Sequence, residues 1–402
     1  MNKKNKIKVL FLSAWYPNRY DAMAGLFVRK HAEAVSLYCD VTVLYLHGDK
    51  NIKDAEIVYQ TINPNAREII VYYPEKRKGI LRKFIKIFNY FHANFIGYKE
   101  VKKTVGVPDI AHVNVLTRTG LLAYWLKKTK NIPYVITEHW TRYLPSRNSY
   151  NGFLRKAISK RIVKNASAVM PVSEDLMQAM KSHGLFNNNY LVVNNVVDDF
   201  FFQQSENVKN NRKFILHVSC FDDEQKNISG ILRVVKKLST IRNDFTMTMV
   251  GTGIDFEDLV NYAKELNIPN EVIRFTGELS PVEVAKEFHL CDFFVLFSNH
   301  ENSPVVICES LCCGKPVLST DVGGISELVN NKNGILIAAQ DEIALELKIN
   351  HMLDYYQHYD TTEIKQSGIE KFSYKSIGNK INYIYINIIK HEKKNHYPNF
   401  NK

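Results

Sequence analysis

Short apolar runs alternate with longer segments of helical periodicity along the first half of the chain. The runs have the length of strands, whereas the segments between them repeat apolar residues every three or four positions. We expect strands at residues 7–13, 41–46, 69–73, 109–113, 133–137, 168–171 and 190–193. We expect helices from residue 25, over residues 76–103 and 119–128, and from residue 173. Such alternation is typical of a parallel sheet covered by helices on both faces.

The same alternation begins again after a polar linker at residues 199–213. Strands are expected at residues 214–218, 245–250, 273–277, 293–297 and 316–318, and a further apolar run follows residue 333. Helices are expected over residues 226–241, 303–314, 342–356 and 372–389. Two successive series of this kind predict two doubly wound α/β domains.

The predicted helix at residues 76–103 combines aromatic with basic residues. Its large apolar residues fall on one side at helical spacing, and they are Leu81, Phe84, Phe88, Phe91 and Phe95. Arg82 and Lys86 fall on the opposite side. A basic helix with exposed aromatic residues suits a membrane–water interface. A helix that packs on the core of its own domain has the same pattern, and the residues leave both interpretations open.

Charge is distributed unevenly along the 402 residues. The net charge is +12, but residues 1–205 carry 31 Lys and Arg against 15 Asp and Glu, whereas residues 206–402 carry 22 against 26. The first domain should therefore meet an anionic partner, and the second should not. Charge alone suits a membrane or a nucleic acid. We predict an anionic membrane surface and no nucleic acid.

The sequence predicts neither a secretory signal nor a membrane span. Residues 1–20 lack the apolar region of a signal peptide, and no stretch of about 18 apolar residues occurs. We therefore expect a cytoplasmic protein, or one that is peripheral on the inner face of the cytoplasmic membrane. The six cysteines form no spaced doublets of the zinc type, and Cys308 and Cys312 suit the buried face of a helix.

Candidate chemistry gathers at residues 299–327. Glu301 and Glu309 have seven residues between them, and Ser303 followed by Pro304 predicts a helix start in that interval. Glu301 would then lie in the loop before the helix, and Glu309 would lie on the helix itself.

Glycines follow this helix at two places. Gly314 is expected to end the helix, and Gly323 and Gly324 follow a short strand and precede another helix. A strand, a glycine turn and a helix N-terminus together aim backbone amides at a phosphate. We therefore expect amides near Gly324 and Val305 to meet an anionic ligand.

Four further residues stand where a strand ends or a helix begins, at the edge where doubly wound sheets bind ligands. His139 follows the strand at residues 133–137, and Gly25 and Gly251 follow strands at tight turns. Lys226 begins a predicted helix, where a cation is unfavourable unless an anion lies nearby. Taken singly, these residues also fit a structural histidine, two tight turns and a solvated lysine.

The order of the motifs from Glu301 onward resembles a known family. The two glutamates, followed by Gly-Lys-Pro-Val, Val-Gly-Gly and Asn-Gly-Ile-Leu-Ile, resemble the nucleotide-sugar domain of family 4 glycosyltransferases. The resemblance implies the GT-B fold, in which two Rossmann-like doubly wound parallel-sheet domains face each other across a cleft. It also implies an acceptor-binding domain at residues 1–200, a donor-binding domain at residues 201–371, and a last helix with a polar tail at residues 372–402 that returns to the first domain.

The resemblance further implies roles for individual residues. Lys226 would bind the donor diphosphate, Glu309 the nucleotide ribose, and Glu301 the transferred sugar. His139 matches the histidine that ends the corresponding strand, and we expect it to be catalytic together with Lys226 and Glu301. The remaining expected donor contacts are Gly25, Gly251, Ser303, Val305, Gly323 and Gly324.

Three positions depart from the family pattern. Cys220 or Phe221 stands where an arginine usually precedes the lysine. The segment at residues 302–304 replaces Gly-Phe-Gly after the first glutamate, and Asn195 replaces a glycine.

The predicted function is transfer of a sugar, with retention of configuration, from a nucleotide diphosphate sugar of the UDP or GDP type to a hydroxyl group. The acceptor is expected to be a glycan or a lipid-linked intermediate of cell-surface polysaccharide synthesis. No Asp-X-Asp triplet occurs, so we expect no metal and no cofactor. A nucleotide-sugar epimerase of the same fold and a non-catalytic nucleotide-sugar-binding protein remain alternatives. A dehydrogenase would need a complete Gly-X-Gly-X-X-Gly, which Phe256 interrupts.

Overall fold

The computed structural model describes residues 6–75, 82–116, 118–147, 149–203 and 212–396, in which the chain divides into two units. The first unit comprises Met1–Val172, Leu176–Val196 and Tyr374–Lys402, and the second comprises Ser173–Asp175 and Val197–Ser373. Each unit contains one sheet with an apolar core on either face.

The sheet of the first unit has seven strands in the order β3-β4-β2-β1-β5-β6-β7. Its strands are β1 (Lys8–Ser13), β2 (Asp40–Asp49), β3 (Glu56–Asn63), β4 (Ala66–Pro74), β5 (Ile110–Asn114), β6 (Tyr134–Glu138) and β7 (Ala168–Pro171). All neighbours are parallel except β3 and β4. Strand β1 lies between β2 and β5, so the order of the strands reverses there, which makes this edge a topological switch point.

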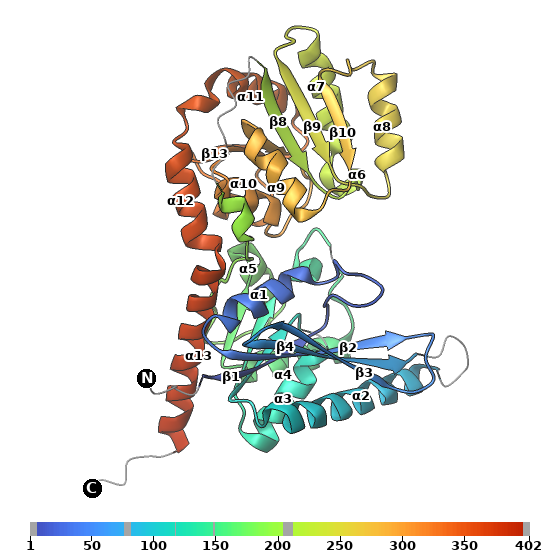
Figure 1. Ribbon diagram of the computed structural model, residues 1–402, viewed down its shortest axis with the longest axis vertical. Coiled ribbons are helices and arrows are strands. Elements are labelled where there is room, and N and C mark those ends of the chain that lie inside the picture. Colours follow the sequence, from blue (N-terminus) through green and yellow to red (C-terminus); the bar gives the residue numbers. More distant parts are fainter. Residues whose placement is uncertain (1–5, 76–81, 117, 148, 204–211, 397–402) are drawn as a thin grey trace. The chain divides into compact units, whose positions relative to one another are not determined.

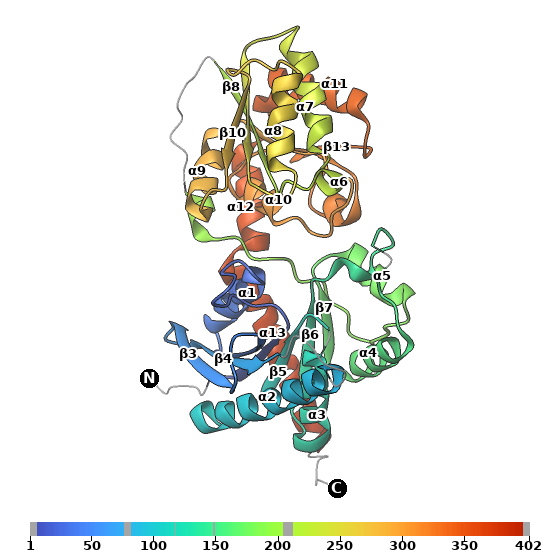
Figure 2. The same cartoon turned by 90° about the vertical axis from the view of Figure 1, so that its right-hand side faces the viewer.

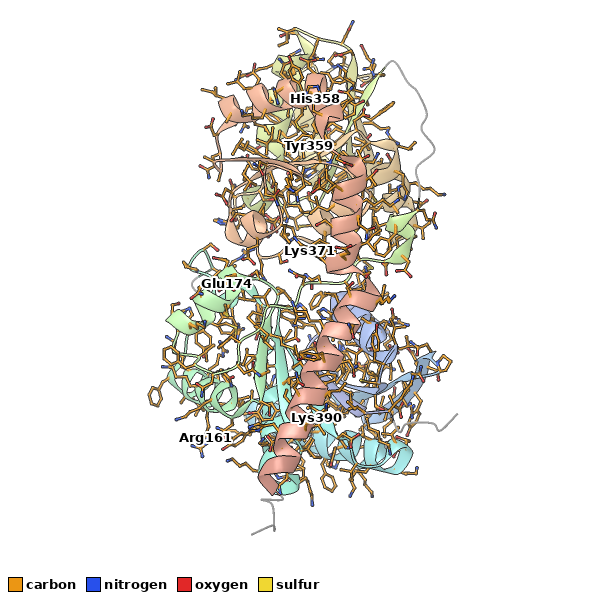
Figure 3. The ribbon with its side chains drawn as sticks, turned by 90° about the vertical axis from the view of Figure 1, so that its left-hand side faces the viewer. Arg161, Glu174, His358, Tyr359, Lys371 and Lys390 are labelled. Carbon is orange, nitrogen blue, oxygen red and sulfur yellow. The ribbon has the colours of Figure 1, made fainter. Side chains whose placement is uncertain are left out.

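Helices cover both faces of this sheet, as Figure 1 and Figure 2 show. One face carries α1 (Leu26–Ser36) and α13 (Tyr374–His396), and Figure 3 labels Lys390 on α13. The other face carries α2 (Arg82–Val105), α3 (Thr119–Lys130), α4 (Phe153–Asn165) and α5 (Glu174–Ser182). Because both faces are covered, β5, β6 and β7 are buried at every position. A short 3₁₀ helix, η1 (Thr141–Tyr143), follows β6.

The sheet of the second unit has six parallel strands in the order β10-β9-β8-β11-β12-β13. Its strands are β8 (Lys213–Val218), β9 (Phe245–Val250), β10 (Ile273–Gly277), β11 (Phe293–Leu296), β12 (Val317–Thr320) and β13 (Gly334–Ile337). The helices are α6 (Asp223–Lys226), α7 (Ile228–Ser239), α8 (Phe256–Glu265), α9 (Pro281–Leu290), α10 (Val305–Cys312), α11 (Glu342–Tyr355) and α12 (Thr361–Phe372), with the 3₁₀ helices η2 (Asp199–Phe202), η3 (Gly323–Glu327) and η4 (Tyr356–His358).

The two doubly wound sheets confirm the predicted fold class, but several predicted elements differ. Residues 190–193 form no strand, since this segment follows the edge of β7 and makes a single isolated bridge through Tyr190. Strand β3 and helices α4, α8, α9 and α12 were not predicted. Strand β3 has no buried position and α4 exposes apolar as well as basic residues, so neither shows a clear apolar face. The linker begins with η2, where Phe201 is buried in the core of the second unit.

The aromatic helix is present as α2, although the part of the prediction at residues 76–81 lies outside the described residues. Its outward-facing aromatic residues are well exposed rather than buried on the core. None of the described helices is both long and apolar enough to cross a membrane.

Candidate functional site

The switch point of the second sheet lies between β8 and β11. These strands are hydrogen-bonded neighbours although β9 and β10 separate them in the chain. The loops that leave their carboxyl ends therefore begin side by side, which is where open α/β sheets bind ligands. One loop leads to Lys226 and the other to Glu301, so the fold joins residues that are 75 positions apart.

Lys226 and Glu301 form an ion pair at this point. The lysine Nζ donates to Glu301 Oε1 at 2.5 Å, and the Ser298 hydroxyl donates to the same oxygen at 2.8 Å. Only 11% of the lysine side chain and 7% of the glutamate side chain are exposed. An anion therefore does accompany Lys226, and it is the carboxylate of Glu301.

The predicted helix start at Lys226 is wrong. Lys226 ends the short helix α6, where a cation is favourable, and α7 begins only at Ile228. Asn227 separates the two helices because its backbone is left-handed, with φ of 49°. Asp222 caps the beginning of α6 by accepting from the backbone N–H of Gln225.

Backbone contacts hold the two loops together. The N–H of Asn299 donates to the Gln225 carbonyl at 2.8 Å, and its side-chain amide donates to the Glu224 carbonyl at 2.9 Å. The Thr320 hydroxyl fixes the Glu301 loop further by donating to the Ser298 carbonyl at 2.7 Å. Asn299 and Thr320 lie in the stretch at residues 299–327 but were given no role from the sequence, and Ser298 was left out of that stretch. Polar residues at the carboxyl end of a buried strand are the signal that could have indicated all three.

The glycine pair supports the Glu301 loop from the other side. A Cβ atom on Gly323 would overlap the Glu301 carbonyl, and one on Gly324 would crowd the Asn302 carbonyl. The N–H of Gly324 donates to that Asn302 carbonyl at 2.8 Å. This amide is therefore engaged within the unit, and the pair allows two loops to approach closely.

Helix α10 begins one residue later than expected. Pro304 occupies its N-cap position and no side chain caps it, so the predicted capping by Ser303 is wrong. Val305 and Glu309 lie one turn apart and are half-exposed, whereas Ile307 on the other side is buried in the core. The helix ends at Cys312, and Gly314 follows it with the predicted left-handed backbone, at φ of 76°, and donates its N–H to the Leu311 carbonyl.

Gly251 and Gly253 pack against the loop that leads to Lys226. Side chains at these positions would overlap the backbone of Ser219 and Phe221. Phe221 is fully buried, whereas Cys220 is exposed. Cys220 is therefore the side chain that faces solvent in the place where the family pattern has an arginine.

His217 is a buried support for the same loop. Its Nδ1–H donates to the Val295 carbonyl at 3.0 Å, and its Nε2 accepts from the Ser219 hydroxyl at 2.7 Å. Burial lowers the pKa of His217 to about 4, helped by the neighbouring charge of Lys226. A single histidine in an otherwise apolar strand was the available signal, and sequence reasoning missed it.

In the first unit, Gly25 and His139 both follow strands at the predicted positions. Gly25 precedes α1 and packs on the backbone of Trp15, which a side chain would overlap. The ring of His139 lies 4.4 Å from that of Phe27 and 5.4 Å from that of His31, measured between centroids. Burial holds the pKa of His139 well below its usual range, so the imidazole is neutral.

Neutral buried histidines should make stability depend on pH. Burial lowers the pKa of His31 to about 4, and its Nε2–H donates to the Asn194 carbonyl at 3.0 Å. The unfolded chain takes up a proton near pH 6.5, but the folded chain does so only near pH 4. The free energy of unfolding should therefore fall as pH decreases from 6.5 to 4, by up to about 3 kcal/mol for each such histidine.

Thermal unfolding of wild type, His31→Gln and His92→Gln between pH 7 and pH 5 would check this expectation. Glutamine keeps a donor for Asn194 but does not titrate, so His31→Gln should flatten the pH dependence of the first unit. His92 is exposed on α2, so His92→Gln controls for the exchange of histidine for glutamine itself. Equal slopes for all three proteins would contradict the assignment.

Comparisons with known proteins identify the family. The family described as glycosyl transferases group 1 matches residues 198–365, and the family described as glycosyltransferase family 4 matches residues 30–199. This chain belongs to glycosyltransferase family 4. The transferase therefore moves a sugar from a nucleotide sugar, which confirms the family and the class of enzyme predicted from the sequence.

Curated relatives cover most of the transferase at low identity. It is 26% identical over 295 residues to N-acetyl-alpha-D-glucosaminyl L-malate synthase of Bacillus anthracis, covering 71% of this chain and 76% of the relative. It is 25% identical over 266 residues to the putative teichuronic acid biosynthesis glycosyltransferase TuaC of Bacillus subtilis, covering 65% of this chain and 64% of the relative.

A solved structure shares the fold over nearly the whole chain. The Anabaena protein HepE, solved in complex with UDP, superposes with a TM-score of 0.70 at 16% identity and covers 95% of the transferase and 100% of HepE. Among the described residues of the transferase, no three His, Cys, Asp or Glu side chains cluster closely enough to hold a metal ion.

Proposed function

We propose that the transferase moves a sugar from a UDP- or GDP-sugar to the hydroxyl group of a lipid-linked or polysaccharide acceptor, with retention of configuration. The observation that carries this proposal is the buried Lys226–Glu301 pair at the switch point of the second sheet. The acceptor class is supported by the relative TuaC, which is named for teichuronic acid biosynthesis, and a UDP donor is supported by the UDP bound to HepE.

The donor would exchange one partner of this ion pair for another. A diphosphate is the natural replacement for the carboxylate on Lys226, because a buried lysine requires an anionic partner. Glu301, released from the lysine, would then accept hydrogen bonds from the hydroxyls of the transferred sugar. In this proposal the Glu301 carboxylate keeps Lys226 in position until the donor binds.

Helix α10 would bind the rest of the donor. The first amides of a helix have no partners within the helix, so those of Val305 and Val306 suit the diphosphate. Glu309 lies one turn further along the same half-exposed side and would accept hydrogen bonds from the ribose hydroxyls. Gly251, Ser303 and Gly323 complete the proposed donor contacts within the second unit, and Gly324 supports them through the hydrogen bond from its amide to the Asn302 carbonyl.

The proposed reaction is a substitution at the anomeric carbon. The bond between this carbon and the diphosphate oxygen breaks, and the acceptor oxygen bonds to the same face of the sugar. The acceptor proton passes to the departing diphosphate oxygen, so the products are the glycoside and a nucleoside diphosphate. Negative charge grows on the diphosphate as its bond breaks, and Lys226 stabilises that charge most strongly in the transition state.

The first unit would meet an anionic membrane on the inner face of the cell. Its excess of Lys and Arg over Asp and Glu supports electrostatic attraction, in which each basic residue near the surface contributes about 1 kcal/mol. A lipid-linked acceptor would be encountered at this surface. The surplus of basic residues lies in residues 1–205, the part of the chain that is expected to bind the acceptor.

A donor panel tests the proposed function. The purified protein is incubated with UDP- and GDP-sugars, with and without a polyprenyl-phosphate-linked sugar, and release of nucleoside diphosphate is measured. Acceptor-dependent release, with the donor's anomeric configuration kept in the product by NMR, is the expected result. Inversion at the anomeric carbon, or conversion of the donor sugar without an acceptor, as an epimerase would perform, would overturn it.

His139→Ala is expected to lower kcat by about 10²-fold or more while the thermal midpoint stays within a few degrees of wild type. The reason is its position at the carboxyl end of β6, where a neutral imidazole can donate a hydrogen bond to a ligand. Steady-state kinetics and differential scanning calorimetry provide the two readings. A large loss of stability with normal specific activity would show that the packing against Phe27 is its whole role.

A further inference from the structure

A groove separates α2 from α3 on the outer side of the first unit, where Figure 1 and Figure 2 show the two helices. Its volume is about 760 Å³, which is in the range of sites that enclose a small ligand. The groove belongs wholly to the first unit and shares no residue with the candidate donor site.

The middle of the groove is aromatic and apolar. Its lining there consists of Phe91, Phe95 and Tyr98 from α2 and Leu121, Leu122 and Trp125 from α3. Three of these aromatic residues are far from buried, since Phe91 is 52%, Phe95 68% and Trp125 46% exposed, whereas Tyr98 is buried at the base of the groove. Soluble proteins seldom expose such a continuous apolar patch without a ligand or partner for it. The same stripe continues along α2 through Phe88 and Phe84, which are 68% and 73% exposed.

Two contacts show that α2 and α3 run in the same direction along the groove. Arg118, before α3, lies over the ring of Tyr90 at 5.2 Å. Further toward the C-terminal ends of both helices, the ring of Trp125 lies 6.1 Å from that of Tyr98. From Tyr90 to Lys103 the groove is about 20 Å long, at 1.5 Å for each helical residue.

Positive charge concentrates at one end of this length. Lys99, Lys102 and Lys103 line the groove at the end of α2, and Lys130 lines it at the end of α3. Lys103 pairs with Glu100 at 3.2 Å. Within the parts of the chain that the structure describes, no carboxylate lies within ion-pair distance of Lys99, Lys102 or Lys130. At the opposite end Arg118 is occupied by its contact with Tyr90.

The surrounding surface has the same sign. Six of the residues of α2, three of α3 and five of α4 are Lys or Arg, and Glu100 is the one acidic residue in these three sequences. Arg161 on α4 is labelled in Figure 3. Exposed apolar residues recur on α4 as well, where Phe153 is 89% exposed. The groove therefore opens on a face that attracts anions.

We propose that the α2–α3 groove binds one anionic membrane lipid, with its phosphate at Lys99, Lys102 and Lys130 and its hydrocarbon chain along Trp125, Phe95 and Phe91. The separation of the groove into a cationic end and an apolar length matches the separation within an amphiphile. An acidic helical peptide would instead need cations along both rims. The groove binds its lipid whether or not that lipid is the acceptor, so the inference does not rest on the proposed reaction.

Dodecyl phosphate, kept below its critical micelle concentration, is the probe. Isothermal titration of the full-length protein without nucleotide sugar should give one site. The fluorescence of Trp125, taken as the difference between wild type and Trp125→Phe, should change over the same concentrations. Inorganic phosphate lacks the hydrocarbon chain, and dodecyl maltoside lacks the phosphate. Each should bind at least about tenfold more weakly than dodecyl phosphate.

Two matched triple variants locate the site. Lys99→Ala/Lys102→Ala/Lys130→Ala removes the cationic end, and at about fivefold for each lysine it should weaken binding about 100-fold. The control removes Arg155, Lys160 and Lys164 from α4, with the same loss of charge on the same face of the sheet, and should stay within about twofold of wild type. Phe95→Ser should weaken binding about tenfold, whereas Phe153→Ser on α4 should not.

Equal loss in both triple variants would show a diffuse electrostatic attraction and would overturn the proposal. So would binding of inorganic phosphate or dodecyl maltoside as tight as that of dodecyl phosphate, or binding that leaves Trp125 unchanged. Because no reading depends on sugar transfer, failure of this proposal and failure of the proposed function give different results.

Discussion

Lys226→Ala is expected to lower kcat by about 10²–10³-fold with a smaller change in the donor KM. In the proposed reaction the lysine would face a diphosphate whose negative charge increases as the glycosidic bond breaks, so its contribution would be larger in the transition state than in the ground state. Steady-state kinetics with the donor found in the panel gives both constants. Activity equal to wild type would show that the diphosphate binds elsewhere.

Glu309→Gln is the matched comparison, because the ribose hydroxyls do not change charge during the reaction. A hydrogen bond to a charged group contributes about 1.5–3 kcal/mol, so the donor KM should rise about 10- to 100-fold while kcat changes little. The two variants should therefore differ in which constant changes. The same kinetic pattern in both would refute the assigned roles.

The ion pair adds a stability effect that has to be separated from catalysis. Lys226→Ala leaves the nearly buried Glu301 carboxylate without its cation, which costs about 3–5 kcal/mol of stability in comparable cases. The double variant Lys226→Ala/Glu301→Gln removes that charge and should recover much of the thermal midpoint. It should not recover kcat, and recovery of both would mean that the lysine acts only on stability.

Gly323→Ala is expected to lower kcat/KM by about 10²-fold, chiefly because it would displace the loop that carries Glu301. The Cβ atom would overlap the Glu301 carbonyl, and the glycine has φ of 56°, a conformation that other residues rarely adopt. The Glu301 loop must therefore move, and a displacement of about 1 Å in a catalytic group can cost about 10²-fold. Kinetics and calorimetry of the purified variant check both consequences.

Gly277→Ala separates displacement from backbone strain. Gly277 has a similar φ of 72°, but a Cβ atom there would meet nothing within 4 Å. This control should lose the stability that backbone strain alone costs, and it should keep its activity. If Gly277→Ala lost as much activity as Gly323→Ala, general destabilisation would explain both variants.

The sequence by itself determined the alternation of strands and helices, since apolar periodicity reports directly which side of each element is buried. It also determined the family, because Glu301, Glu309 and the glycines that follow them occur in one continuous stretch. Several elements were not predicted, and two of them, β3 and α4, have little apolar patterning. The edge strand β3 has exposed positions along its length, and α4 exposes basic residues on most of its surface.

Only the tertiary structure decided how the candidate residues meet. The pairing of Lys226 with Glu301 depends on β8 and β11 being neighbours, and strand order is a non-local property that periodicity does not contain. The exposure of Cys220 rather than Phe221 depends on the core beneath the loop.

The environment of α2 was likewise decided only by the tertiary structure. Its sequence fitted both a packed helix and an exposed aromatic surface, because a stripe of apolar residues does not say what covers it. Tyr90 and Tyr98 are buried against the sheet, whereas Phe91 and Phe95 face outward beside α3. That division follows from the rotation of the helix on the sheet, which is set by packing among segments that lie far apart in the chain.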